Sequence, residues 1–272
     1  MLKGGNIFFM PVNTLIHIGR RTASGIEELG YVFMLFLESL YWLFMGKRRR
    51  QKVRVPAIFQ EAMLIGVQAI PIISGLSLVV GVMLAIQGIE TLRTFGAESK
   101  VVIGIALSVT REFSPLIVGI LVAGRSGSAI TARIGTMHES QEIDALRVIG
   151  INPVRYLASP VLLAMLLSVP SLTVLSDFMG LLGGGIFTVQ KLDMTMTSYF
   201  RQAFEVLSVD DVGQGFIKSF VFAVIIAMVG VSNGFQVRGG AEGVGRATTR
   251  SVVLSISFII LADMIFTYFL NR

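Results

Sequence analysis

The sequence predicts an all-α integral membrane protein, with an N-terminal interfacial helix, five transmembrane helices, and a cytoplasmic helix between the second and third of them. Of its 272 residues, 53% are hydrophobic and only 15% are charged, whereas soluble domains carry about 25% charged residues. The mean hydropathy is +0.76. Several apolar stretches approach or exceed the ~20 residues that an α-helix needs to cross a bilayer. They are continuous and lack the two-residue alternation of a membrane β-barrel.

The N-terminal region, residues 1–61, is expected to be cytoplasmic and interfacial. Its stretch 26–45 is apolar, but Glu27, Glu28 and Glu38 interrupt it and a basic run follows directly. These charges favour a helix that lies in the membrane interface over a sixth span. The first residues lack a convincing signal-peptide cleavage site, so this region is expected to be retained.

Residues 62–272 are expected to form one transmembrane domain, because neither a 20-to-50-residue repeat nor a low-complexity linker divides them. Gly183, Gly184 and Gly185 predict a bend or tight helix packing in the third span. The segment 188–215 follows that span and is expected to form short helices. The five spans are predicted at residues 62–87, 101–123, 158–187, 216–235 and 251–270.

The positive charges indicate the orientation. Of the 23 Lys and Arg residues, 16 fall in segments 1–61, 124–157 and 236–250. Positive residues accumulate on the cytoplasmic side, so these segments and the N-terminus are expected inside and the C-terminus outside. Lys218 is counted on the outer side. Because the basic residues lie mainly at the ends of spans, the net charge of +6 indicates membrane anchoring rather than nucleic-acid binding. The sequence has no cysteine, which excludes disulfides and thiolate metal sites.

Charged residues inside the predicted spans need partners or a watery cavity. Arg111 and Glu112 lie in the middle of the second span. Neighbouring helical positions point about 100° apart, so these two side chains are expected to meet different surroundings. Pro115 predicts a kink here, because the residue before a proline resists helical geometry. Asp263, in the last span, is expected to be a buried ion-pair partner, with a proton or sodium site as the alternative. Asp177 is either such an ion site or a residue near an interhelical turn.

A polar block, residues 124–160, separates the second and third spans. Gly124, Ser128 and Ala132 recur every fourth residue and predict a smooth stripe for packing within one subunit or, as the alternative, between two copies. The string from Thr136 to Glu139 fits a capping box, which predicts that a helix begins here and runs to about residue 149. Gly150 then supplies a left-handed C-terminal cap.

Four strings in the chain resemble the MlaE permease family, also called YrbE, in order and spacing. They are TREFSP at 110–115, AGRSGSAITA at 123–132, QEIDAL at 141–146 and GVGRATTRSVV at 243–253. The resemblance covers residue 62 to the C-terminus. The polar block is also similar to the Glu-Ala-Ala loop of ABC importer permeases, with Asp144 in place of Glu and Leu146 in place of the second Ala.

The resemblance implies a homodimeric permease in a bacterial inner-membrane ABC complex that moves phospholipids between the inner and outer membranes. It implies a cytoplasmic ABC ATPase, a STAS-domain protein and a periplasmic ring of MCE-domain subunits as partners. The chain lacks a GxxxxGK[ST] phosphate loop, so ATP is expected on the ATPase, and this chain is expected to hold no cofactor, metal or catalytic residue. The helix in the polar block would be the coupling helix. Its contact residues would be Glu139, Glu142, Asp144, Ala145, Leu146 and Gly150.

The resemblance also implies a lipid cavity at the dimer interface, lined by the first two spans and the turn between them. The candidate lipid-contacting residues are Leu84, Gln87, Leu92, Phe95, Arg111, Glu112 and Phe113. A structural charge network is the alternative role for Arg111 and Glu112. Two other functions stay open: a proton-coupled secondary transporter that uses the intramembrane carboxylates Glu112, Asp177 or Asp263, and a membrane scaffold without transport.

Overall fold

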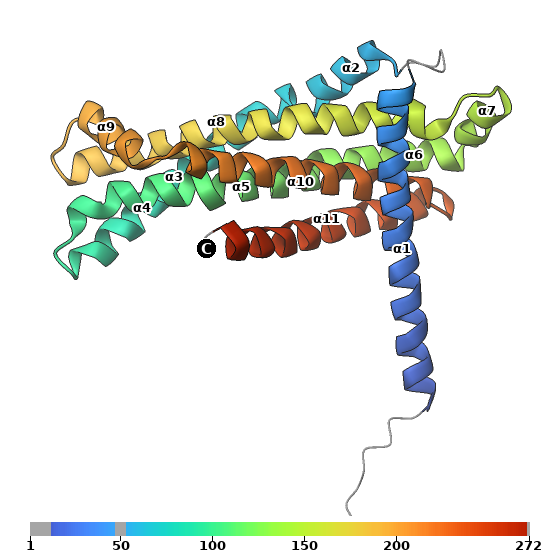
Figure 1. Ribbon diagram of the computed structural model, residues 1–272, viewed down its shortest axis with the longest axis horizontal. Helices are drawn as coiled ribbons and strands as arrows, with labels where there is room; N and C mark the ends of the chain where they lie inside the picture. Colours follow the sequence, from blue (N-terminus) through green and yellow to red (C-terminus); the bar gives the residue numbers. More distant parts are fainter. Residues whose placement is uncertain (1–11, 47–52, 271–272) are drawn as a thin grey trace, which may run out of the picture.

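The computed structural model describes residues 12–46 and 53–270, and the regular elements in these ranges are all helical. Figure 1 shows the long helices side by side in one bundle, with α1 crossing them near one end. The helices are α1 (Val12–Met45), α2 (Val55–Ile65), α3 (Ile70–Arg93), α4 (Val101–Ser108), α5 (Ser114–Val122), α6 (Ser128–Glu139), α7 (Glu142–Val148), α8 (Ser159–Lys191), α9 (Met196–Val206), α10 (Val209–Phe235) and α11 (Gly240–Leu270).

Six helical stretches in the described residues are long and apolar enough to cross a membrane. Five of them coincide with the predicted spans, and the last one ends one residue before its predicted end. Each of the five begins earlier than predicted, because the helical backbone starts in the polar residues that precede the apolar run. They are Val55–Arg93, Glu98–Glu139, Val154–Lys191, Val209–Phe235 and Gly240–Phe269. The sixth is Gly25–Met45 within α1. The chain is therefore a multi-pass, all-helical membrane protein.

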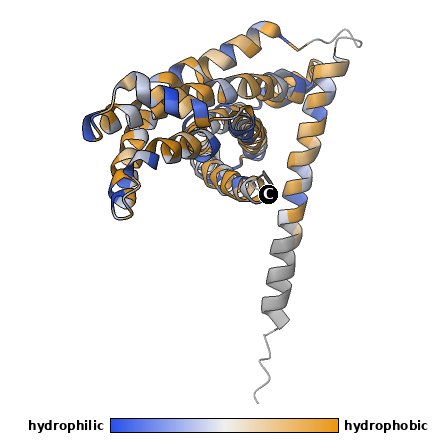
Figure 2. Cartoon of the chain, turned by 60° about the vertical axis from the view of Figure 1, so that its left-hand side comes forward, coloured by the Kyte–Doolittle hydropathy of each residue, from blue (hydrophilic) through white to orange (hydrophobic). Residues whose placement is uncertain are grey.

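The direction of α1 differs from that of the other long helices. α1 runs across the bundle at the end where α7 lies (Figures 1 and 2). Its length and composition would permit a span, but a helix transverse to the spans fits the expected position in the membrane interface. The interfacial position stays a prediction. The basic run at 47–52 lies outside the described residues.

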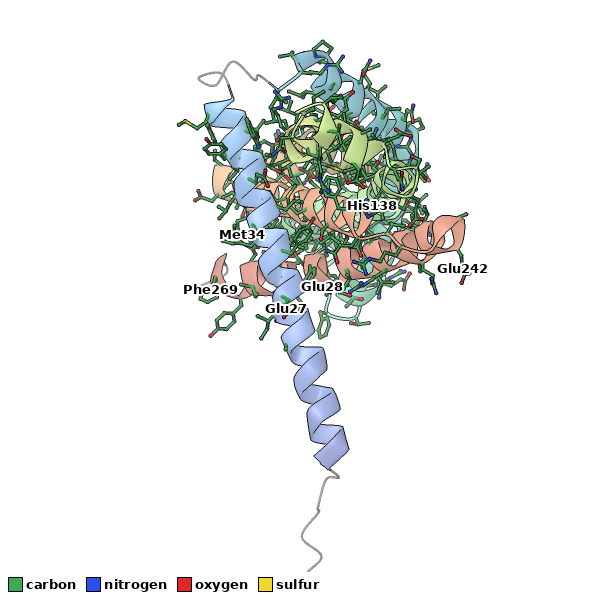
Figure 3. All side chains as sticks on the ribbon, turned by 90° about the vertical axis from the view of Figure 1, so that its right-hand side faces the viewer. Glu27, Glu28, Met34, His138, Glu242 and Phe269 are labelled. Atoms are coloured by element: carbon green, nitrogen blue, oxygen red, sulfur yellow. The ribbon has the colours of Figure 1, made fainter. Side chains whose placement is uncertain are left out.

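Two of the acidic residues that interrupt the apolar stretch of α1 have partners elsewhere in the bundle, one on α11 and one in the loop after α7. Arg250 of α11 donates a hydrogen bond to Glu28, which lies where α1 crosses the bundle (Figure 3). The Nδ2 atom of Asn152 donates to Glu38 Oε1 at 2.9 Å. These contacts explain why an otherwise apolar helix carries these two carboxylates: they fix α1 to the bundle.

The glycines predicted to allow tight packing lie where α8 meets α3. A Cβ atom at Gly183 would come within 2.1 Å of the Leu78 carbonyl oxygen, and one at Gly81 within 1.9 Å of the Gly180 carbonyl oxygen. The hydroxyl groups of Ser77 and Ser176 hydrogen-bond at 2.7 Å in the same contact. Small residues let helices approach where lipid supplies no hydrophobic drive. The tight-packing prediction is confirmed.

The second predicted span is one continuous helical stretch with two π-helical turns, at Val109–Phe113 and Ala123–Gly127. Ser114, the residue before Pro115, keeps helical angles (φ −64°, ψ −52°), so its expected resistance to helical geometry is not seen, and the kink stays a prediction. The irregularity lies one turn earlier, where the π turn contains Arg111 and Glu112. Single π turns inside α-helices are frequent at functional sites.

The predicted stripe of small residues is not the close-packed face of α6. A Cβ atom at Gly124 would meet no heavy atom within 4 Å. The contact with α10 is made instead by the next face, where the Thr131 hydroxyl donates to the Gly230 carbonyl oxygen at 2.9 Å. A Cβ atom at Gly127 would lie 3.2 Å from Ile226. Packing within the subunit therefore uses the face of Gly127 and Thr131 and leaves open space beside Gly124.

The segment after the third predicted span contains one short helix, α9, as expected. Tyr199 of α9 is fully buried and belongs to a small apolar core with α3, α4 and α8. Polar residues gather around α9 and the α3–α4 turn (Figure 2). These two features mark the α9 end of the bundle, opposite the α7 end (Figure 1).

Candidate functional site

A buried charge cluster joins the π turn to α10 and α11. Lys218 Nζ lies 2.5 Å from Glu112 Oε2 and 2.9 Å from Asp263 Oδ1, and it donates to the Thr267 hydroxyl at 3.0 Å. The Thr267 hydroxyl donates in turn to Glu112 Oε1 at 3.1 Å. The Lys218 side chain is 0% exposed, so its charge depends on these partners.

Arg111 has a separate partner. Its Nε donates to Asp211 Oδ1 at 2.7 Å, and Asp211 is itself buried in the first turn of α10. Asp211 Oδ2 accepts from the Ser208 backbone N–H at 2.8 Å, which completes the capping box that starts α10. The adjacent residues Arg111 and Glu112 thus meet different surroundings, as the helical spacing predicted.

The two groups differ in exposure. The Arg111 and Glu112 side chains are 34% and 30% exposed, whereas Lys218 and Asp211 are 0% and 4%. Arg111 and Glu112 therefore each form an ion pair with a buried residue and remain partly exposed, so that a bound molecule could contact them. Asp177, on α8, takes part in neither group, and its Oδ1 has no hydrogen-bond partner among the described residues.

A groove of about 270 Å³ runs between α3 and α4 at the α9 end. Three of the predicted lipid-contacting residues line it: Leu84, Gln87 and Leu92. Its other lining residues are Gly88, Thr91, Val101, Gly104, Ile105 and Ser108. We call this the α3–α4 groove. Its lining combines apolar side chains with a few hydroxyl and amide groups.

The other predicted lipid-contacting residues lie outside this lining. Phe95 is 78% exposed in the turn after α3. Arg111, Glu112 and Phe113 belong to the π turn that directly follows Ser108 at the edge of the groove. The structure thus separates the predicted set into a groove, a turn and a charge-bearing π turn.

The helix expected at 136–149 is two helices, and the predicted capping box is wrong. Thr136 and Glu139 lie in the last turn of α6, where the Thr136 carbonyl oxygen accepts from the Ser140 N–H at 2.9 Å. The Glu139 carboxylate accepts instead from the Gly240 N–H at 2.9 Å. The chain then reverses at Gln141, whose φ is 61°. The pattern failed because α6 continues out of the bundle, so the Glu139 amide already belongs to a helix.

α7 projects from the bundle between this turn and a glycine cap (Figure 1). Gly150 has a φ of 79° and donates to the Arg147 carbonyl oxygen at 3.0 Å, so the predicted left-handed cap is confirmed. Ile143 is 1% exposed and attaches α7 to the bundle. Glu142, Asp144 and Ala145 are exposed and Leu146 is half-buried.

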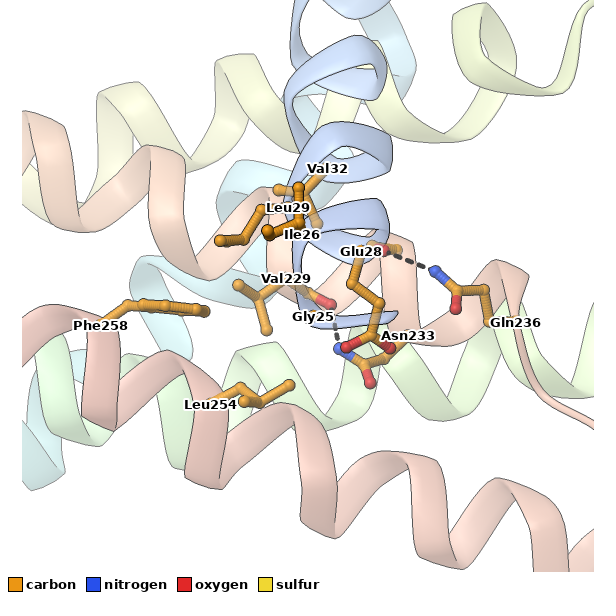
Figure 4. Close-up of a pocket in the computed structure, with 11 residues that line it drawn as sticks. Gly25, Ile26, Glu28, Leu29, Val32, Val229, Asn233, Gln236, Leu254 and Phe258 are labelled. Carbon is orange, nitrogen blue, oxygen red and sulfur yellow. Dashed lines mark hydrogen bonds between the residues drawn. The ribbon is translucent and has the colours of Figure 1, made fainter. Parts of the chain in front are cut away.

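A second large hollow, of about 400 Å³, lies between α1, α10 and α11 (Figure 4). Its walls are mostly apolar. At its polar end, Asn233 donates to the Val229 carbonyl oxygen at 2.8 Å and Gln236 donates to the Ser232 hydroxyl at 3.0 Å. These amides thus have acceptors within α10 itself.

Comparison with known proteins identifies the family. A family model described as Permease MlaE matches residues 58–269. The chain belongs to the MlaE permease family. It is 32% identical over 260 residues to the intermembrane phospholipid transport system permease protein MlaE of Haemophilus influenzae, which covers 95% of this chain and 97% of that protein.

Other MlaE-like proteins come from bacteria and a plant. A probable ABC transporter permease protein of Rickettsia felis is 31% identical over 258 residues, covering 95% of this chain and 98% of that protein. The chloroplastic protein TRIGALACTOSYLDIACYLGLYCEROL 1 of Arabidopsis thaliana is 35% identical over 190 residues, covering 70% of this chain and 54% of that protein. The chain therefore resembles permeases along nearly its whole length.

Sequence reasoning missed the partners of the charged residues in this MlaE family member. Lys218 was assigned to the outer side, but α10 begins at Val209 and places Lys218 inside the bundle. No partner role is predicted from sequence for Asp211 or Thr267. The signal for Asp211 was the Ser208-x-x-Asp211 pattern, which fits a capping box and predicts the earlier start of α10.

Proposed function

We propose that this chain is the permease subunit of an ABC transporter that moves phospholipids between the bacterial inner and outer membranes. It acts as a homodimer, and a cytoplasmic partner ATPase hydrolyses ATP. The single observation that carries this proposal is the α3–α4 groove, which lies beside the charge-bearing π turn at the end opposite α7. The MlaE relative in Haemophilus, which is named for intermembrane phospholipid transport, supports phospholipid as the substrate.

The groove suits part of a phospholipid. Leu84, Leu92 and Ile105 offer apolar wall, and the partly exposed Arg111 next to it offers a cation for a phosphate. Its volume of about 270 Å³ is below the roughly 300–1,000 Å³ of sites for drug-sized ligands. A two-chain lipid therefore needs a second wall, which a second copy of the chain would supply.

The α3 helix supports dimerisation, because its exposed face is apolar. Leu76, Val79, Met83 and Ile86 are each at least 41% exposed. This face lies on the same helix as the groove. Two copies that meet along it would enclose their grooves in one lipid cavity.

α7 provides the contact with the ATPase. Its exposed carboxylates Glu142 and Asp144 can form ion pairs with basic side chains on a partner. Two hydrogen bonds beside α7 connect it to the bundle and would transmit its movement. Glu139 is bonded to the start of α11, and Asn152, just after α7, is bonded to Glu38 of α1. Displacement of α7 would thus move α1 and α11, and α11 carries Asp263 and Thr267 of the charge cluster. A STAS-domain protein and a periplasmic MCE-domain ring complete the proposed complex.

The distribution of arginines supports the orientation. Arg125, Arg133, Arg147, Arg155 and Arg250 all lie on elements of the α7 end, which is therefore the proposed cytoplasmic end. The N-terminus is then cytoplasmic and the C-terminus periplasmic.

Filling the α3–α4 groove tests the proposal. Gly104 lines the groove, and a Cβ atom there would meet no heavy atom within 4 Å, so Gly104→Leu should fold and occupy the space of a lipid chain. The leucine side chain would exclude the lipid chain from the groove, and the lipid would lose the binding energy of that contact. Transfer of labelled phospholipid by the reconstituted complex should therefore fall about tenfold or more.

Gly213→Leu is the matched control, because Gly213 on α10 also has no heavy atom within 4 Å of a Cβ and lies outside the groove lining. This variant should keep wild-type transfer. Equal transfer by Gly104→Leu and wild type would exclude the groove as the lipid path.

A further inference from the structure

A separate hollow of about 250 Å³ lies toward the α7 end, between α2 with the 3₁₀ turn that follows it (Val67–Ala69) and the second π turn with α6. Its polar lining consists of Glu61, Gln68, Ser126 and two arginines, Arg125 and Arg133. These arginines are eight residues apart and thus share one side of the same helical stretch. We call this the two-arginine hollow. None of its lining residues lines the α3–α4 groove.

Both arginines have unsatisfied hydrogen-bond donors. Arg125 Nη2 donates to Gln68 Oε1 at 2.7 Å, and Arg133 Nη2 lies 2.6 Å from Glu61 Oε1. Arg125 Nη1 and Arg133 Nε, however, are shielded from solvent and have no acceptor among the residues that the structure describes. A shielded donor without an acceptor is costly. Two arginines against one carboxylate leave one positive charge, which an anion such as a phosphodiester would balance.

An apolar hollow of about 250 Å³ adjoins it and shares Arg125 as a lining residue. Ile72, Ile120 and Leu121 form its walls, and Gly124 leaves open space beside its backbone. Gln68, in the 3₁₀ turn before α3, is polar, and the residues that follow it on α3 are mostly apolar. On the neighbouring stretch, Arg125 is charged and the residues before it, back to Leu121, are apolar or glycine. The Arg125 to Gln68 hydrogen bond marks the level where both stretches change from polar to apolar.

We infer that these two hollows form a binding site for a membrane phospholipid, with its phosphate at Arg125 and Arg133 and an acyl chain along Ile72 and Ile120. The arginines line one hollow and the apolar side chains line the hollow next to it. A phospholipid in a leaflet has the same arrangement, with its charged headgroup at the surface and its acyl chains in the apolar interior. The site is additional to the α3–α4 groove. With the orientation proposed above, the site lies in the cytoplasmic leaflet; the rest of the inference does not depend on that orientation.

Site-specific photocrosslinking of the assembled complex tests this site. Ala129 is exposed and lines the two-arginine hollow. The full chain with benzoylphenylalanine at position 129, in vesicles that contain labelled phosphatidylglycerol, should capture the lipid on illumination. Short-chain phosphatidylglycerol should compete for capture, whereas inorganic phosphate and diacylglycerol should not.

Two variants separate the phosphate contact from the acyl contact. Arg125→Gln with Arg133→Gln should lower capture about tenfold, since two charge-assisted contacts are lost. Gly124→Leu fills the apolar hollow and should lower capture without changing any charge. Gly104→Leu, in the α3–α4 groove, should leave capture at position 129 unchanged. If the double arginine variant does not fold, Gly124→Leu decides.

Three results would overturn the inference. Unchanged capture in Gly124→Leu and the folded arginine variant would show that the hollows do not hold the lipid. Competition by inorganic phosphate together with no effect of Gly124→Leu would assign the site to free phosphate. Crosslinking of position 129 to a second copy of the chain in place of lipid would make the hollow part of the dimer interface. None of these results tests the α3–α4 groove. The proposed function is tested separately, by lipid transfer in the Gly104→Leu variant.

Discussion

Replacing Lys218 with methionine should prevent the chain from accumulating as a folded protein. The Lys218 side chain is 0% exposed and lies between Glu112 and Asp263. Removal of one partner from a buried ion-pair group leaves the others uncompensated and typically costs about 3–5 kcal/mol. Size-exclusion chromatography of detergent extracts and thermal melting would measure the loss.

A triple variant separates the loss of charge balance from the loss of lysine itself. Lys218→Met combined with Glu112→Met and Asp263→Leu removes all three charges, and replacement of a whole buried ion-pair group by apolar residues of similar volume is often neutral or stabilising. Folding should therefore return. Lys100→Met, at an exposed lysine in the α3–α4 turn, is the matched control and should fold normally. A Lys218→Met protein that folded and melted like wild type would contradict the role given to this cluster.

Reversing the charges of α7 should have the largest effect on transport without loss of folding. Glu142 and Asp144 are exposed, and the Asp144 to Arg147 pair is 58% and 63% exposed. Exposed pairs of this kind contribute at most about 1 kcal/mol to stability. Like charges brought together in an interface cost several kcal/mol. Glu142→Lys with Asp144→Lys should therefore abolish ATPase assembly and reduce lipid transfer about tenfold or more.

Copurification of the ATPase, with lipid transfer measured in parallel, checks this result. Glu205→Lys is the control, because Glu205 is 68% exposed on α9 at the opposite end and its reversal should leave both readouts unchanged. If the α7 double variant assembled and transferred lipid like wild type, α7 would not be the coupling helix.

The sequence predicted the spans well and their ends poorly. Apolar runs located five helical stretches, because hydropathy directly reflects burial in lipid. The ends depended on polar contacts that a run of residues does not reveal. α10 begins seven residues before the predicted span because Asp211 caps it, and this shift changed Lys218 from an outer anchor to a buried partner.

The candidate site was predictable where chemistry is local. Arg111 and Glu112 stood out because charges are rare inside spans, and Gly150 because a helix cap favours glycine. The capping box at Thr136 failed because the same four-residue pattern also fits the end of α6. Leu84, Gln87 and Leu92 came from the family resemblance, and the groove that contains them requires α4 to pack against α3. No local pattern could show that contact.

ATP-dependent lipid transfer by the reconstituted complex tests the central claim most directly. The chain, its partner ATPase and the MCE-domain subunits would be placed in vesicles with fluorescent phospholipid, with or without ATP and with or without a pH gradient. The permease account predicts transfer that requires ATP and an active ATPase and does not respond to the gradient. Lipid movement by the purified chain alone, driven by a pH gradient through Glu112, Asp177 or Asp263, would contradict it.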